Sequence, residues 1–214
     1  TEERRATAVE TVRAVRRVLS LPLTVGGGVR SIEDGAALLE AGADRVAVNS
    51  AAVRRPALVS ELAARFGVQC IVVAIDAARH NPDHHTAPDP QPKADRTQPP
   101  VTTPGWEVVV SGGKERTGID AVAWAVEAEQ RGAGEVLLTS WDRDGTGEGY
   151  DLDLLRAITS HVRIPVIASG GAAHADHLEQ ALQAGAAAVL AASIFHDGHL
   201  TVAEVKQSLQ RAGR

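Results

Sequence analysis

Residues 137–150 read LLTSWDRDGTGEGY, and this stretch decides how the rest of the chain is interpreted. A short apolar run ends in two hydroxyl residues, Thr139 and Ser140, and carboxylates and glycines follow it. An apolar run that stops at polar, glycine-rich positions is typical of a buried parallel strand. Glycine also lets the backbone approach a ligand closely. The stretch therefore predicts a strand whose carboxyl end lies at a functional surface.

Strands and helices are predicted to alternate along the whole chain. Short apolar runs predict strands, and apolar residues at helical spacing, often ended by glycine, predict helices. The predicted strands are 21–25, 45–48, 70–75, 135–139, 165–168 and 188–192. The predicted helices are 1–19, 31–41, 56–66, 120–131, 152–159, 173–184 and 201–210. This alternation is typical of a parallel sheet with helices outside it.

A glycine turn followed by a serine occurs twice at the same spacing. Gly28 and Ser50 end neighbouring predicted strands 22 residues apart, and so do Gly171 and Ser193. The second half also has two strands before its glycine turn, so symmetry predicts two more strands ahead of Thr1. Eight parallel strands with outer helices form a (β/α)8 TIM barrel. We expect one such domain over residues 1–214, lacking about its first two strands.

An open six-stranded sheet is the alternative to the barrel. The dinucleotide-binding form of such a sheet carries a GxGxxG sequence after a strand. No strand of this chain is followed by that sequence. The barrel is therefore the preferred fold class.

Residues 80–105 interrupt the alternation and hold seven of the ten prolines. Such a segment has almost nothing apolar to bury and is predicted to be a surface insertion rather than a domain boundary. Its His80, His84 and His85 could bind a metal, but a solvated histidine-containing loop is the preferred interpretation. Residues 106–113 are expected to form a small hairpin arm.

Composition excludes several classes of function. The net charge is −5 and no block of Lys or Arg occurs, which argues against a nucleic-acid or anionic-membrane surface. No apolar run approaches the roughly 20 residues of a membrane span. The single Cys70 lies in an apolar run and indicates a reducing compartment, so a cytoplasmic location is expected. No metal or cofactor is expected.

The two glycine turns are candidate phosphate-binding sites. Each turn frees backbone N–H groups at the start of a helix, where partial positive charge favours an anion. Gly28 and the Gly170–Gly171 pair make the turns, and Ser50 and Ser193 can add hydroxyl donors. Two such sites predict an elongated substrate with a phosphate at each end.

Carboxylates at the strand ends are the candidate acid–base groups. Asp76 follows a wholly apolar run and can exchange protons there. Of Asp142 and Asp144, one is expected to face the substrate and the other to hold the loop through Arg143. Asp144 is preferred for the chemistry because it precedes a glycine. Substrate contacts are also expected from the polar residues that end two strands, Asn49, Thr139 and Ser140.

Six segments together resemble the cyclase subunit of imidazole glycerol phosphate synthase, a family of histidine biosynthesis. They are LTVGGGVRS, RVAVNSAAV, VVAIDA, GEVLLTSWDRDGTGEGYD, PVIASGG and AAVLAASIFH, which leave out residues 80–105. The resemblance implies a (β/α)8 barrel with a substrate that carries two phosphates. It also implies a partner glutaminase, whose ammonia passes through the barrel and adds to the substrate. The products would be imidazole glycerol phosphate and an aminoimidazole carboxamide ribotide.

The resemblance also implies roles for individual residues. One of the family's two acid–base aspartates matches Asp76, and the other falls before Thr1. Charged residues that gate ammonia match Arg45 and Glu135, although the family commonly has lysine at the first position. The phosphate sites match Gly28, Ser50, Gly171, Ala192 and Ser193, with Gly145 nearby.

Two other functions remain open from the sequence. The sister isomerase of the same pathway shares the barrel, the phosphate sites and a similar DGT loop, although SWDRDGTGEGYD and AASIFH favour the cyclase. A chain of 214 residues in the cell could instead be a non-catalytic remnant that binds a phosphosugar or a glutaminase. A six-stranded piece would expose two sheet edges.

Overall fold

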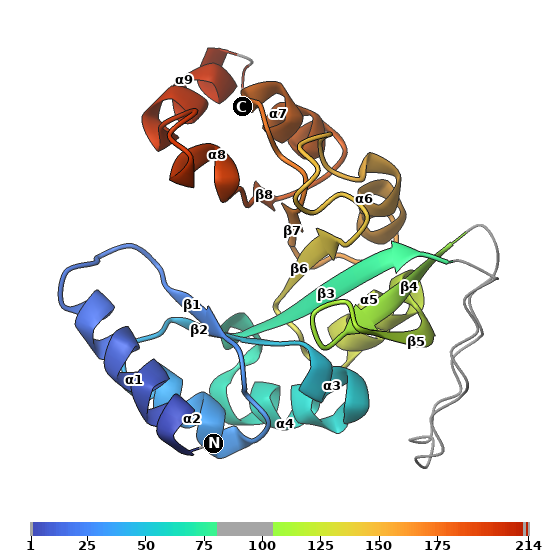
Figure 1. Cartoon of the computed structure of the whole chain (residues 1–214). Helices are drawn as coiled ribbons and strands as arrows, with labels where there is room; N and C mark the ends of the chain where they lie inside the picture. The colour runs from blue at the N-terminus through green and yellow to red at the C-terminus, as the bar shows by residue number, and fades with distance from the viewer. Residues whose placement is uncertain (1, 81–104, 212, 214) are drawn as a thin grey trace. The chain divides into compact units, whose positions relative to one another are not determined.

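The computed structural model describes residues 2–80, 105–211 and 213 (Figure 1). The chain forms two compact units. The first comprises Thr1–Ala74 with Glu127–Glu135, and the second comprises Ile75–Val126 with Val136–Arg214. No helix within the described ranges is long and apolar enough to cross a membrane.

In the first unit, helices alternate with short parallel strands. Its elements are α1 (Glu2–Arg16), β1 (Thr24–Gly26), α2 (Ile32–Glu40), β2 (Arg45–Val48), α3 (Ser50–Arg54), α4 (Ala57–Phe66), the 3₁₀ turn η1 (Val68–Cys70) and the start of β3 (Ile71–Arg79). Strand β2 lies between β1 and β3, with Val46 opposite Val25 and Ile71. Helix α2 begins where the sequence predicts, because Asp34 N donates to the Ser31 hydroxyl at 3.3 Å.

The second unit begins with an antiparallel hairpin and then continues the β/α alternation. Its elements are the rest of β3, β4 (Trp106–Val110), β5 (Glu115–Asp120), α5 (Ala121–Gln130), β6 (Glu135–Ser140), α6 (Leu152–Thr159), β7 (Val166–Ser169), α7 (Ala175–Gln183), β8 (Ala188–Val189), α8 (Ser193–His196) and α9 (Val202–Arg211). Strand β7 pairs in parallel with β6 and β8. Strand β4 pairs antiparallel with β3 and β5.

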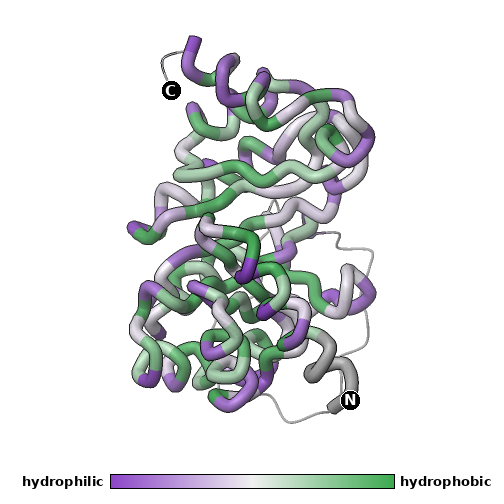
Figure 2. The backbone as a smooth tube through the Cα atoms, turned by 90° about the vertical axis from the view of Figure 1, so that its left-hand side faces the viewer, coloured by the Kyte–Doolittle hydropathy of each residue, from purple (hydrophilic) through white to green (hydrophobic). Residues whose placement is uncertain are grey.

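The order of the parallel strands is β1-β2-β3-β6-β7-β8, with β4 and β5 branching from β3. A parallel sheet in which helices connect successive strands is the arrangement of the (β/α)8-barrel class, and the predicted fold class is confirmed. The buried side chains are mainly Ala, Val, Leu and Ile from strands and from one side of each helix. Figure 2 shows hydrophobic and hydrophilic residues alternating along the helices, as expected for helices with one buried side.

Strand β3 is longer than the sequence predicts. The sequence predicts a strand over residues 70–75, where the apolar run lies, but the strand continues to Arg79. Residues 76–79 pair with 106–109 of β4, so backbone hydrogen bonding to the hairpin extends the strand beyond its hydrophobic part. Asp76 therefore lies inside a strand rather than after one.

Other boundaries differ because short elements carry little periodicity. The first helix ends at Arg16 and the first strand begins at Thr24, and β8 has only two residues. Ser50 and Ser193, predicted to follow strands, are the first residues of the short helices α3 and α8. The hairpin has a second strand, β5, that was not predicted. His84, His85 and most of the predicted insertion lie outside the described residues.

Candidate functional site

The segment after β6 folds back on the end of its own strand. Arg143 N and Asp144 N both donate to Ser140 O, at 3.3 and 2.9 Å. Gly145 follows with a φ of 76°, a conformation that side chains rarely adopt. This turn brings the Asp144 carboxylate to the side of a cavity next to β7.

The turn after β7 requires glycine for two reasons. Gly170 and Gly171 have φ values of 92° and 97°. A Cβ on Gly171 would also lie 2.3 Å from the carbonyl oxygen of Gly149. The backbones are this close because Gly149 N donates to Gly171 O at 2.8 Å. The turn after β7 and the segment after β6 are therefore packed directly against each other.

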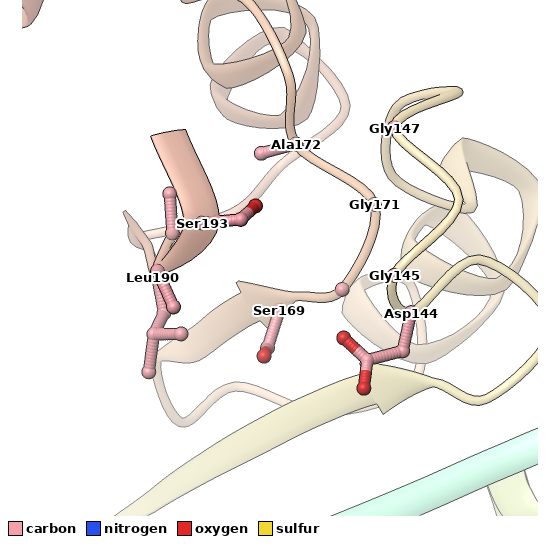
Figure 3. A pocket seen from close by; sticks show the side chains of 11 residues that line it. Asp144, Gly145, Gly147, Ser169, Gly171, Ala172, Leu190 and Ser193 are labelled. Atoms are coloured by element: carbon pink, nitrogen blue, oxygen red, sulfur yellow. The ribbon is translucent and has the colours of Figure 1, made fainter. Parts of the chain in front are cut away.

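A cavity of about 180 Å³ lies between these two segments and the start of α8. Its lining consists of Asp144, Gly145, Gly147, Ser169, Gly170, Gly171, Ala172, Leu190, Ala191, Ala192 and Ser193. Figure 3 shows the Asp144 carboxylate and the Ser193 hydroxyl on opposite sides of it. Glycine backbones and hydroxyl groups around a small cavity are suited to binding a phosphate.

Half of the residues predicted to bind or to react meet in this cavity. They are Asp144, Gly145, Gly170, Gly171, Ala192 and Ser193. The lining also includes Gly147, Ser169, Ala172, Leu190 and Ala191, which the sequence interpretation did not single out. The glycine spacing after Asp144 and the polar end of β7 were the signals that could have identified Gly147 and Ser169.

Thr139 and Ser140 lie differently, as successive residues of a strand do. The Thr139 methyl would be 3.4 Å from a Cβ on Gly170, beside the cavity. Ser140 is only 2% exposed and lines a separate space of about 10 Å³ with Tyr150 and Asp151. Ser140 is thus not brought to the larger cavity, and its hydroxyl has no hydrogen-bond partner within residues 2–80, 105–211 and 213.

Asp142 and Asp144 have separate surroundings. Asp142 accepts a hydrogen bond from Arg79 N at 2.7 Å, whereas Asp144 lines the cavity. One of these two aspartates was expected to hold the loop by pairing with Arg143, but the acidic partner of Arg143 in the structure is a different residue. Arg143 instead pairs with Glu148 at 2.7 Å, because Asp142 is directed at the end of β3.

Asp76 lies in the same unit but not in the cavity lining. It is half-buried on β3, opposite Val109 of β4. The next residue, Ala77, accepts a hydrogen bond from Trp141 N at 2.8 Å. This bond joins the strand that carries Asp76 to the first residue of the segment that carries Asp144.

The first unit holds the other glycine turn. Gly27 and Gly28 have φ values of 93° and 82°, and a Cβ on either would meet open space. Gly28 lines a cavity of about 530 Å³ together with Arg30 and the carboxylates Glu33 and Asp34. Asn49 and Ser50 are not among its lining residues, and lie at the start of α3.

Arg45 and Glu135 begin β2 and β6, at the amino ends of these strands. Arg45 Nη2 lies 3.3 Å from Glu135 Oε1, and both side chains are partly buried. Arg45 Nε also donates to Gln69 O at 3.3 Å. The two residues predicted as a gate therefore form an ion pair at the amino ends of their strands.

The His, Cys, Asp and Glu side chains of the described part of the chain do not gather as a set of metal ligands would. None of its residues form a group of three or more His, Cys, Asp or Glu side chains that could hold a metal ion. His174 and His177 lie with ring centroids 5.3 Å apart, and His177 Nδ1 accepts a hydrogen bond from Ala173 N at 3.2 Å. That imidazole nitrogen is therefore already used by the backbone.

Comparison with known proteins places the chain in one family. Residues 1–201 match the model of a family described as histidine biosynthesis protein. The chain is 50% identical over 208 residues to imidazole glycerol phosphate synthase subunit HisF of Nocardia farcinica. This match covers 97% of the present chain and 75% of the relative. The HisF subunit of Pyrobaculum aerophilum is 51% identical over 211 residues, covering 99% of this chain and 75% of its own. That of Microcystis aeruginosa is 51% identical over 211 residues, covering 98% and 76%. These relatives favour the cyclase over the sister isomerase.

Proposed function

This chain belongs to the histidine biosynthesis family and, within it, to the HisF cyclase subunits of imidazole glycerol phosphate synthase, and from that premise we propose the reaction that it catalyses. The chain acts as a lyase in the cytoplasm on the open-chain phosphoribulosyl-formimino-aminoimidazole-carboxamide. Ammonia from a glutaminase partner adds to this substrate. Ring closure and cleavage then release imidazole glycerol phosphate and aminoimidazole carboxamide ribotide.

The observation that carries this proposal is the cavity between β6, β7 and α8. Phosphate oxygens bind well to backbone N–H groups and hydroxyls that are already fixed in position. The turn of Gly170 and Gly171 and the Ser193 hydroxyl supply such groups around about 180 Å³. One phosphate of the substrate binds here, and the turn of Gly28 with Asn49 and Ser50 binds the other.

Asp144 and Asp76 carry out the proton transfers. Asp144 lines the phosphate cavity, so its carboxylate reaches a substrate whose phosphate is held there. Asp76 lies one residue before Ala77, which is hydrogen-bonded to the same segment of chain. Closing the imidazole ring and breaking the adjacent bond both require protons to be removed and returned, which carboxylates at such positions can do. Thr139 and Ser140 support this end of the site.

Ammonia enters at the amino ends of β2 and β6, which begin with Arg45 and Glu135. The Arg45–Glu135 ion pair lies there, at 3.3 Å, and opening this pair lets ammonia pass from the glutaminase subunit. Arg binds a carboxylate in a more rigid, forked geometry than Lys does. The gate of this chain is therefore expected to open less readily than one built on lysine.

Substitution of Asp76 by Asn tests the proposal in the full natural chain. We expect turnover of the open-chain substrate with ammonium to fall about 10²–10⁴-fold with KM nearly unchanged, because an acid–base group is lost while the binding contacts stay. Isomerisation of the closed-ring precursor is the parallel assay. An unchanged rate in Asp76→Asn, or isomerisation without cyclisation in the wild type, would refute the proposal.

A further inference from the structure

Trp106, the first residue of β4, makes two contacts outside its own hairpin. The Arg79 guanidinium lies over its ring, 4.8 Å from the centroid, as in a cation–π pair. Its indole Nε1 donates to Asp151 Oδ2 at 3.0 Å. The other oxygen of Asp151 accepts from Leu154 N at 3.0 Å and so caps helix α6. Trp106 is thereby joined to the helix that follows the candidate site.

Arg79 makes the second connection to the same segment. Its backbone N donates to Asp142 Oδ2 at 2.7 Å. Its side chain lies 3.7 Å from Asp153 Oδ2, and its carbonyl oxygen accepts from Arg116 Nη1 at 3.1 Å. Both ends of residues 142–151 are therefore fastened to the Arg79–Trp106 pair. Asp144, Gly145 and Gly147, which line the cavity, lie between those two ends.

The hydrogen bond between Trp106 and Asp151 is made by a buried carboxylate. Asp151 is only 9% exposed, and its two oxygens accept from two different elements. A carboxylate with little access to water depends on its protein donors, so loss of one donor favours movement of the side chain or of its segment. The exposed Arg143–Glu148 pair in the same segment lacks this constraint.

We propose that Trp106 is a positioning residue which, through Asp151 and Arg79, holds residues 142–151 so that Asp144 and Gly145 face the phosphate cavity. The inference rests on the proposed function, since it assigns this cavity to a phosphate of the substrate. It goes further in giving a role to the β4–β5 hairpin, none of whose residues line the cavity.

Two substitutions separate this role from simple support of the fold. Trp106→Phe keeps a ring beneath Arg79 but removes the N–H donor. Asp151→Asn keeps an oxygen for Leu154 N, and Asn is as good an N-cap as Asp, but it turns an amide N–H₂ toward the indole N–H. The matched control is Asp120→Asn, because Asp120 Oδ1 accepts from Ala123 N at 2.8 Å and caps α5 away from the cavity.

The measurements are kcat and KM with ammonium as the nitrogen source, and the Kd of inorganic phosphate by calorimetry. We expect each of Trp106→Phe and Asp151→Asn to lower kcat about 3–10-fold and to weaken phosphate binding at this cavity by a similar factor, while the proposed phosphate site at the turn of Gly28 keeps its affinity. The double variant should be no worse than the poorer single variant, because both remove one interaction. Asp120→Asn should match the wild type.

Three results would overturn the inference. They are unchanged kcat and phosphate Kd in both single variants, losses that multiply in the double variant, and an equal loss in Asp120→Asn. Phosphate binding also separates this inference from the proposed function. If the wild type binds phosphate but does not turn over the substrate, the proposed function fails, and the phosphate Kd of the variants still decides the role of Trp106.

Discussion

At the scale of single residues, the site is specified mostly by glycine. Gly171 is left-handed in φ and is also packed against backbone, since a Cβ there would lie 2.3 Å from Gly149 O and 3.0 Å from Arg143 O. Gly145 lines the same cavity with a φ of 76°, yet a Cβ there would meet open space. A side chain at Gly145 would therefore meet only the unfavourable backbone conformation, whereas a side chain at Gly171 would also clash with neighbouring carbonyl groups.

Alanine substitution at these two glycines should have unequal effects. Gly145→Ala should cost about 1 kcal/mol of unfolding free energy, because only the left-handed conformation opposes it. Gly171→Ala should cost about 2–4 kcal/mol, because two carbonyl groups must also move. Gly171→Ala should also abolish phosphate binding at the cavity that Gly171 lines, which calorimetry would record as the loss of one of the two proposed phosphate sites. Equal losses in denaturant titrations of the two variants would contradict the packing argument.

Asp44 provides a prediction about pH. The hydrogen bond from Leu23 N, at 2.7 Å, lowers the pKa of Asp44 below its ordinary value of 3.8, and the neighbouring Arg16 lowers it further. A carboxyl with a lowered pKa stabilises the fold above its ordinary pKa and loses this effect as the pH falls through the lowered value. Asp44→Asn should therefore lower the thermal midpoint near neutral pH.

The difference between Asp44→Asn and the wild type should shrink as the pH falls from 3.8, the ordinary pKa of the carboxyl, through the lowered pKa of the folded state, because the wild-type carboxyl becomes protonated over that range. Thermal unfolding followed by circular dichroism over that range measures it. A difference that does not shrink as the pH falls through that range would mean that the ionised form of Asp44 contributes nothing to stability.

At the scale of elements, the sequence predicted the strands and helices that carry their own hydrophobic pattern and missed those that depend on neighbours. The alternation of β6 and the glycine ends of helices were visible in the sequence. Strand β3 beyond Asp76 was not, because its residues are extended by pairing with β4. The five-residue α3 and four-residue α8 are too short to show a helical period. The burial of Ser140 could have been inferred from strand alternation alone.

The β4–β5 hairpin holds a buried ion pair that the sequence does not reveal. Glu107 is 4% exposed and accepts hydrogen bonds from Arg116 Nη1 and from Gly118 N. Removing one partner of a buried pair leaves an uncompensated charge. Arg116→Met should therefore destabilise the protein by about 2–4 kcal/mol in denaturant titrations, somewhat less than for a fully buried pair because Arg116 is partly exposed.

The double variant Arg116→Met with Glu107→Met should recover part of that loss, because no charge is then left buried. The exposed Arg55–Glu61 pair is the control, and Arg55→Met should cost at most about 1 kcal/mol. If the double variant were less stable than Arg116→Met, the pair would be acting through packing rather than charge.

At the scale of the whole molecule, the repeat in the sequence reappears in the structure of both units. Gly28 and Gly171 both have positive φ, and Ser50 and Ser193 both begin a short helix after a strand. The sequence predicted this correspondence because spacing along the chain fixes which strand each residue follows. It could not predict that Gly171 is closely packed while Gly28 is open, since that depends on the segments lying beside them.

The repeat leads to a prediction about the two serines. If each hydroxyl donates to one phosphate of the substrate, Ser50→Ala and Ser193→Ala should each raise the KM of the bis-phosphorylated substrate about tenfold, the effect of losing a hydrogen bond to a charged group. The double variant should show about the product of the two effects, because each serine contacts a different phosphate. Ser160→Ala, at the end of α6, is the control and should leave KM unchanged.

A ligand with a single phosphate tests whether each serine contacts a different phosphate, because a general destabilisation of the fold would weaken its binding in both serine variants. Imidazole glycerol phosphate carries a single phosphate, so its Kd should respond to one of the two serine substitutions and not to the other. Two hydroxyls that served the same phosphate would instead both weaken this ligand, and the substrate would lose little more in the double variant than in either single one. The repeat predicts that only one serine substitution weakens the binding of imidazole glycerol phosphate. Each copy of the glycine turn and its serine forms a separate site, and a single phosphate can occupy only one of them.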